Sequence, residues 1–262
     1  MHLHVGPLSR PLMALMVLAI AMRYEAAADT ATVIPLPATD KAQLEALLGP
    51  GVVGEALPGL PLGTADSYLP AKGTSNSYQV LDSNRKPTTE THKVEDTTDP
   101  AYSPGWRYSI GGVGVDFFMK GPDGSIITVA EQDLDHKVLS QFTPGEPRII
   151  SGLKPGESKT FTLSVSVYDL SDLKKVMHSG SLDVTYTYVG AYRVKVPAGS
   201  YDAVLIRWDY SGKVGPATIK DSQHRFLAPK TGMVAMIQVR SISAMLIYND
   251  RTKLGKVLEH AP

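Results

Sequence analysis

The sequence predicts a mainly β protein, built as a curved antiparallel meander that forms a half-barrel, a barrel or a sandwich, with one short N-terminal helix. Apolar and polar residues alternate along several runs, as they do on strands with one buried face. Short turns rich in Gly and Pro separate these runs, and strands joined by short turns pair antiparallel. Eight or more such strands curl to bury the face that they share.

Residues 1–28 have the pattern of a secretory signal peptide. The first ten residues include Arg10 and no acidic residue, and the apolar run 11–22 follows them. This run is shorter than the roughly 20 apolar residues of a membrane span and suits the apolar region of a signal peptide. The small residues Ala26–Ala28 complete a cleavage site, so we expect cleavage after Ala28. An uncleaved anchor and an N-terminal helix of the fold are the alternatives.

The composition limits where the mature chain works and what it binds. The chain contains no cysteine, which excludes disulfides and the lipid attachment of a bacterial lipoprotein. Lys and Arg number 26, as do Asp and Glu, so no basic excess favours nucleic acid or an anionic membrane surface. No later apolar run is long enough to span a membrane. We therefore expect a soluble periplasmic protein, with secretion as the alternative.

Residues 29–105 are expected to form an irregular N-terminal arm with a short helix and polar loops. The helix is predicted over 38–48, where Thr39 or Asp40 can cap its start and Gly49 can end it. One face of this helix carries apolar residues that can dock on a core: Leu44, Leu47 and Leu48.

The remainder of the arm is predicted to be irregular. Gly and Pro recur from 50 to 63 and forbid regular structure there. Residues 78–107 are polar, which predicts a long loop with one or two strands. We expect the arm to pack on the sheet or to be partly disordered; a lid or a partner-binding segment is the alternative.

An antiparallel β domain is expected over 106–262. Asp123-Gly124 lies between two apolar runs and predicts a hairpin, because these residues tolerate the positive φ of a primed turn. A second turn at 132–136 precedes a strand at 138–142. The clearest alternation, 160–167, places its four apolar residues on one face. The later apolar faces are Leu182, Val184, Tyr186 and Tyr188; Val204, Ile206, Trp208 and Tyr210; Met233, Ala235, Ile237 and Val239; and Ile242, Ala244, Leu246 and Tyr248.

No pattern assigns a catalytic residue, a cofactor or a metal site. The sequence lacks nucleophile motifs, and the glycines of 111–114 lack the third glycine and the helix of a dinucleotide loop. Asp133, Asp135 and His136 could supply metal ligands, but acidic residues in a hairpin turn explain them better.

Two pairs of polar residues fall on neighbouring predicted strands. Asp209 and Asp221 form one pair, and Arg207 and His224 form the other. Such residues commonly make cross-strand ion pairs on a solvated face, so we assign no catalysis to them.

A resemblance to a known family lies between residues 196 and 236. Val-Pro-Ala-Gly-Ser-Tyr-Asp at 196–202 and Phe-Leu-Ala-Pro-Lys-Thr-Gly-Met-Val at 226–234 resemble the DUF3108 or TapB-like group of exported bacterial proteins of unknown function. Ser200 replaces the commoner Thr, and Lys230-Thr231 replaces the usual Gly-Val. The resemblance implies an exported protein whose antiparallel sheet curves as a half-barrel, similar to periplasmic lipoprotein carriers.

Three functions remain open. The leading hypothesis is a non-enzymatic periplasmic protein that binds an apolar or amphipathic molecule on its concave face. The second is a structural or assembly factor of the cell envelope that acts through protein contacts. The third is an enzyme, such as a hydrolase, that uses carboxylates or His224. The candidate ligand-binding residues, which could equally fill the core, are the aromatic residues Tyr186, Tyr188, Trp208, Tyr210 and Phe226.

Overall fold

The structure is a computed structural model that describes residues 31–82, 86–121, 125–244 and 248–262. The predicted signal peptide and the predicted Asp123-Gly124 turn lie outside the described residues. The elements in chain order are β1 (Thr32–Val33), α1 (Ala38–Leu48), β2 (Val53–Gly59), the 3-10 helix η1 (Ala65–Tyr68), β3 (Ser75–Asp82), β4 (Thr88–Asp96), η2 (Pro100–Tyr102), β5 (Gly105–Ile110), β6 (Gly114–Lys120), β7 (Ile126–Asp133), β8 (Val138–Pro147), β9 (Ser158–Asp169), β10 (Asp172–Val196), β11 (Gly199–Val214), β12 (Ala217–Ala228), β13 (Gly232–Ala244) and β14 (Tyr248–His260).

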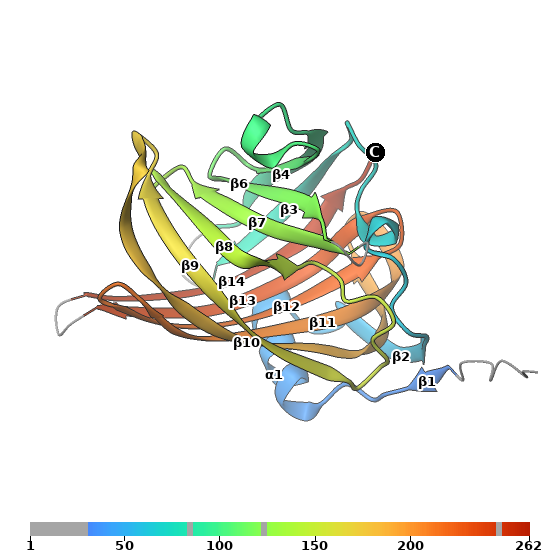
Figure 1. Cartoon of the computed structure of the whole chain (residues 1–262). Helices are drawn as coiled ribbons and strands as arrows, with labels where there is room; N and C mark the ends of the chain where they lie inside the picture. Colours follow the sequence, from blue (N-terminus) through green and yellow to red (C-terminus); the bar gives the residue numbers. More distant parts are fainter. Residues whose placement is uncertain (1–30, 83–85, 122–124, 245–247) are drawn as a thin grey trace, which may run out of the picture.

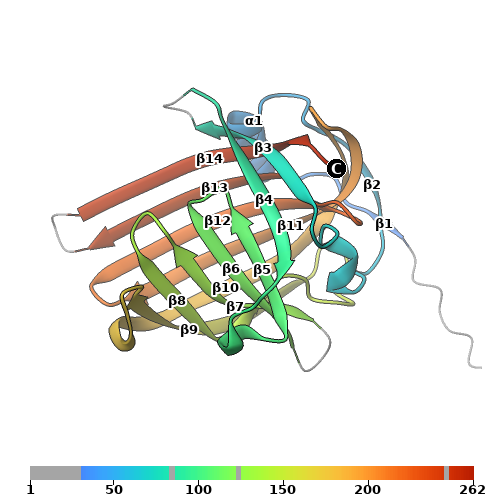
Figure 2. The same cartoon turned by 90° about the horizontal axis from the view of Figure 1, so that it is seen from above.

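Strands β3 to β14 form a closed antiparallel barrel (Figures 1 and 2). Each strand pairs with the next one along the chain, and β14 returns to pair with β3. β9 also pairs with β10 over most of its length, so no barrel strand is left with a free edge there. Of the three shapes that the sequence allows, the molecule adopts the barrel.

The barrel takes in two strands from the segment 29–105, in addition to those of 106–262. β3 and β4 are polar in sequence, yet some of their polar side chains, such as Asn76 and His92, are buried. The expectation that Gly and Pro forbid regular structure is wrong for β2. This strand contains Pro58, but it pairs at the margin of the sheet, where a missing N–H costs little.

Helix α1 has the predicted bounds and lies against the outside of the barrel (Figure 1). Gly49 ends it with a φ of 90°, as predicted. The predicted cap at Thr39 or Asp40 is wrong: the residue before the helix is Pro37, and no side chain caps the first turn. Leu44 and Leu48 are buried, and they pack on an outer apolar cluster of the barrel that includes Tyr192, Phe226, Ala235 and Ile237.

The two ends of the barrel differ. Segment 60–73, which contains η1, packs its Leu62 and Ala65 into the interior cluster at one end. Backbone hydrogen bonds fix this segment: the Leu62 N–H donates to Leu153 O at 2.9 Å, and the Gly152 N–H donates to Leu62 O at 2.7 Å. Strand hairpins form the opposite end (Figure 1). Among the described residues, no helix is long and apolar enough to cross a membrane.

Candidate functional site: a two-lobed cavity in the barrel interior

The barrel interior is incompletely filled and contains two adjoining cavities. The larger, here called the apolar lobe, measures about 220 Å³, and the second, here called the polar lobe, about 180 Å³. Glu131, Gln223 and Arg225 line both lobes and so mark their junction. The aliphatic and aromatic wall of the apolar lobe is Phe142, Leu163, Val165, Val167, Leu182, Val214, Ile219 and Ile242.

Strand alternation explains why charged side chains lie inside. On β12, Asp221, Gln223 and Arg225 are two residues apart, so all three share the inward face. On β7, Glu131 lies opposite Asp116 of β6 in the strand pairing, and both line the polar lobe. The interior therefore has a polar layer built from regular strands.

Arg225 is held rigidly at the junction of the lobes. Its Nε donates to Gln223 Oε1 at 3.0 Å, and its guanidinium carbon lies 4.8 Å from the centroid of the Trp208 ring. Among the described residues, no carboxylate oxygen lies within 4.0 Å of its nitrogens. At longer range, the negative charges of Glu146 and Asp116 act on the guanidinium.

Three carboxyl groups near Arg225 differ in their partners. Asp116 lies 3.7 Å from Arg148 Nη1, and Glu146 accepts a hydrogen bond from Tyr210 Oη at 2.8 Å. Glu131 receives no hydrogen bond or ion pair from any described residue. Burial, and then the negative charges of Asp116 and Glu146, raise the pKa of Glu131 to about 8.

Asp221 is a fourth interior carboxyl group. Its Oδ2 accepts hydrogen bonds from Gln223 Nε2 at 2.7 Å and from Gln238 Nε2 at 2.8 Å. Its Oδ1 is buried and has no partner in the described structure. Burial raises the pKa of Asp221. Asp221, one of the residues that line the apolar lobe, therefore holds one carboxyl oxygen buried without a described partner.

A separate, satisfied network lines the polar lobe. His92 Nδ1 lies 2.6 Å from Tyr108 Oη, and His92 Nε2 and Lys256 Nζ both contact Glu90 Oε1. Burial opposes ionisation of Glu90, but the His92 hydrogen bond and the Lys256 charge lower its pKa to about 2. Burial lowers the pKa of His92. These residues are hydrogen-bond and ion-pair partners of one another, and together they form a polar wall beside the lobe.

A wider cavity of about 630 Å³ lies at the hairpin end of the barrel. It shares Arg240 with the apolar lobe and Lys256 with the polar lobe, and so adjoins both. Asp133, Asp135 and His136, considered above as metal ligands, line this cavity. Asp133 instead closes a turn, accepting hydrogen bonds from the His136 backbone N–H and Nδ1, both at 2.8 Å.

The five aromatic candidates do not form one groove. Tyr186, Tyr188 and Trp208 are fully buried parts of the interior cluster, and only Tyr210 lines the apolar lobe. Phe226 points the other way and packs under α1, because it alternates with the inward-facing Arg225. Sequence reasoning missed Glu131, Gln223 and Arg225. The signal available was the run of polar residues at alternate positions of one strand, 221, 223 and 225.

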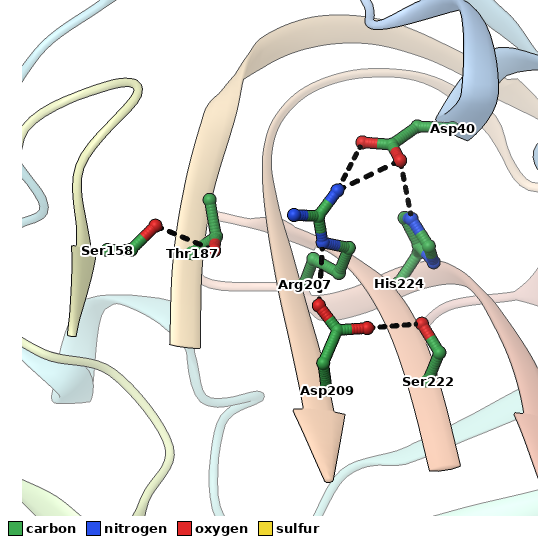
Figure 3. A network of polar contacts seen from close by, with 7 residues as sticks. All are labelled: Asp40, Ser158, Thr187, Arg207, Asp209, Ser222 and His224. Carbon is green, nitrogen blue, oxygen red and sulfur yellow. Dashed lines mark hydrogen bonds and ion pairs between the residues drawn. The ribbon is translucent and has the colours of Figure 1, made fainter. Parts of the chain in front are cut away.

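The two pairs of polar residues predicted on neighbouring strands have different outcomes in the structure. Arg207 lies opposite His224 as expected, but Asp221 lies opposite Tyr210 and faces the interior. On the outer face, Arg207 Nη1 donates to both oxygens of Asp40 at 3.0 and 3.1 Å (Figure 3). His224 Nε2 lies 3.4 Å from Asp40 Oδ1, and Figure 3 shows this contact. This network ties the start of α1 to the barrel.

Comparison with known proteins leaves the family open. No protein-family model matches the sequence, and no curated protein matches it significantly. A Bacteroides fragilis structure described as a "putative exported protein with YmcC-like fold" shares 14% identity with a TM-score of 0.44, covering 74% of this chain and 98% of its own. A Parabacteroides distasonis structure described as a "putative lipoprotein" shares 14% identity with a TM-score of 0.37, covering 77% and 100% respectively. The resemblance to the DUF3108 or TapB-like group stays a prediction.

Proposed function

We propose that this chain is an exported protein, cleaved after Ala28 and released into the periplasm, that binds an amphipathic small molecule inside its barrel. The observation that carries the proposal is a pair of adjoining pockets in the barrel. Small-molecule sites are typically concave and largely formed before the ligand binds. Here a cavity of about 220 Å³ adjoins a second of about 180 Å³.

The chemistry of the walls indicates an amphipathic occupant. The apolar lobe has a wall of aliphatic side chains, and its inner end carries Glu131, Gln223 and Arg225. Small-molecule sites typically combine a mainly apolar lining with a few convergent polar groups. The larger lobe is somewhat smaller than the roughly 300–1,000 Å³ of drug-sized sites, so a ligand that reaches past Arg225 into the polar lobe fits best.

Native mass spectrometry of the protein isolated from its own cells tests the proposal. We expect a bound small molecule, or uptake from a panel of short-chain lipids, with one ligand per chain. A bare protein mass that stays unchanged across the whole panel would overturn the ligand role.

A protruding hairpin favours a second candidate, an envelope factor that acts through protein contacts. The tip between β9 and β10 extends beyond its neighbours (Figure 1) and exposes three apolar side chains. Leu173, Val176 and Met177 are 51%, 45% and 46% exposed. A photo-crosslinker placed at Val176 in living cells should yield one dominant protein adduct if this candidate is correct. Diffuse labelling, equal to that from the exposed Thr162 on the same hairpin, would exclude it.

A further inference from the structure

The interior charges are not evenly matched, and the imbalance indicates what kind of head group the cavity takes. Three interior cations have a carboxylate within 4.0 Å: Arg148 has Asp116, Arg240 has Asp250, and Lys256 has Glu90. Arg225 is the only interior cation of the described lobes without one.

Three interior carboxyl groups, by contrast, have no cation within that distance in the described structure: Glu131, Glu146 and Asp221. Glu146 is satisfied by Tyr210, and Asp221 is half satisfied by two amides. Glu131 has neither a cation within 4.0 Å nor a hydrogen-bond donor among the described residues. Among the described residues that line the two lobes, carboxyl groups without a cation within 4.0 Å therefore outnumber cations without a carboxylate within 4.0 Å by three to one.

We propose that the ligand carries a positively charged nitrogen, and that this nitrogen pairs with Glu131 at the junction of the two lobes. The inference rests on the proposed ligand-binding function and names the chemical class of that ligand. An alkylammonium group supplies N–H donors to Glu131, while its chain lies along Val165, Val167 and Leu182.

A carboxylate head group is less well accommodated. The groups that face Glu131 from the surrounding strands include Asp116, Glu146, Asp221, Arg148 and Arg225. The field of the first two, added to burial, holds the pKa of Glu131 at about 8, so placing a negative charge here is costly. A ligand carboxylate beside Glu131 would meet the same cost. A ligand cation beside Glu131 would instead lower the cost of ionising the Glu131 carboxyl group, and it would balance the negative charge that results.

Three probes with the same eight-carbon chain test the inference on the mature protein, residues 29–262: octylamine, octanol and octanoate. Each affinity is measured by isothermal titration calorimetry at pH 7. We expect octylamine to bind about ten- to a hundredfold more tightly than octanol, which corresponds to one charge-assisted hydrogen bond. Octanoate should bind most weakly.

Two substitutions provide the matched comparison. Glu131→Gln keeps the size and removes the charge, so it should abolish the preference for octylamine over octanol. Glu55→Gln changes an exposed carboxyl group on β2 outside the barrel and should leave all three affinities unchanged.

The outcomes separate the two proposals. Failure of all three probes to bind contradicts the proposed ligand role itself. Binding in which octanoate equals or exceeds octylamine, or in which Glu131→Gln keeps the amine preference, overturns the assignment of a cationic head group and leaves the ligand role standing.

Discussion

Glu131 and Asp116 lie directly opposite each other in the pairing of β7 with β6, and both side chains line the polar lobe. Two carboxyl groups placed this way cannot both ionise without cost. Arg148 lies 3.7 Å from Asp116, whereas Glu131 has no cation within 4.0 Å among the described residues. The arrangement leaves Glu131 protonated at neutral pH and ready to ionise when a cation arrives.

Stability should fall with rising pH because of Glu131. Its pKa in the folded protein, about 8, lies above the ordinary value of 4.5, so the folded state binds more protons than the unfolded state between these values. The free energy of unfolding should therefore decline from about pH 4.5 to pH 8, on the order of 1 kcal/mol per pH unit at most. Urea denaturation across this range should show a shallower decline in Glu131→Gln. An identical slope in both proteins would contradict this account.

Binding of a cation should release protons. At pH 7 most Glu131 side chains carry a proton, because the pKa is about 8, and pairing with an ammonium group favours the charged form. Octylamine binding should therefore release up to one proton per chain. Calorimetric enthalpies measured in phosphate and in Tris should differ accordingly, and the difference should vanish in Glu131→Gln. Equal enthalpies in both buffers for the unsubstituted protein would refute the linkage.

Filling the apolar lobe should block binding. Val167 of β9 lines this lobe and is only partly buried, so Val167→Phe places a ring in the cavity with little strain on the strand. We expect at least a tenfold loss of affinity for octanol, with the β circular dichroism spectrum unchanged. The control is Ser164→Phe, an exposed position on the opposite face of β9. Equal affinity in both variants would place the ligand elsewhere.

The outer network should stabilise the docking of α1. The Asp40 side chain is 5% exposed, and it accepts two hydrogen bonds from Arg207 at 3.0 and 3.1 Å. Asp40→Asn leaves the Arg207 charge without its buried partner, so we expect a loss of about 1–3 kcal/mol in the free energy of unfolding. Glu45→Gln, on the exposed face of the same helix, should cost less than about 0.5 kcal/mol. If Asp40→Asn lowers the free energy of unfolding no more than Glu45→Gln does, the outer network does not stabilise the docking of α1.

Much of the fold was predictable because the strands of the β domain alternate strictly. Leu163 and Val165 of β9, and Leu182 and Val184 of β10, all face the interior as their alternation indicates. The bounds of α1 were predictable from its leucine spacing and Gly49. The closure of the barrel was not, since pairing of β14 with β3 joins residues that are distant in the sequence.

The site was harder to predict for a physical reason. An interior polar layer breaks the apolar alternation that identifies an inward face, so Gln223 and Arg225 look like a solvated strand face in sequence. The sequence instead led us to predict aromatic residues as the ligand-binding site, and most of these residues belong to the hydrophobic core. Tyr186 and Trp208, for example, pack edge to face with ring centroids 5.0 Å apart. Which carboxyl group lacks a partner depends on strand register, and this is visible only in three dimensions.

A crystal structure of the mature protein, residues 29–262, at saturating octylamine shows whether Glu131 pairs with a cationic head group. We expect continuous density for the chain between Val165, Leu182 and Ile219, with the nitrogen at about 3 Å from a Glu131 carboxyl oxygen. Lobes that hold only ordered water, with octylamine absent or bound outside the barrel, would contradict this pairing.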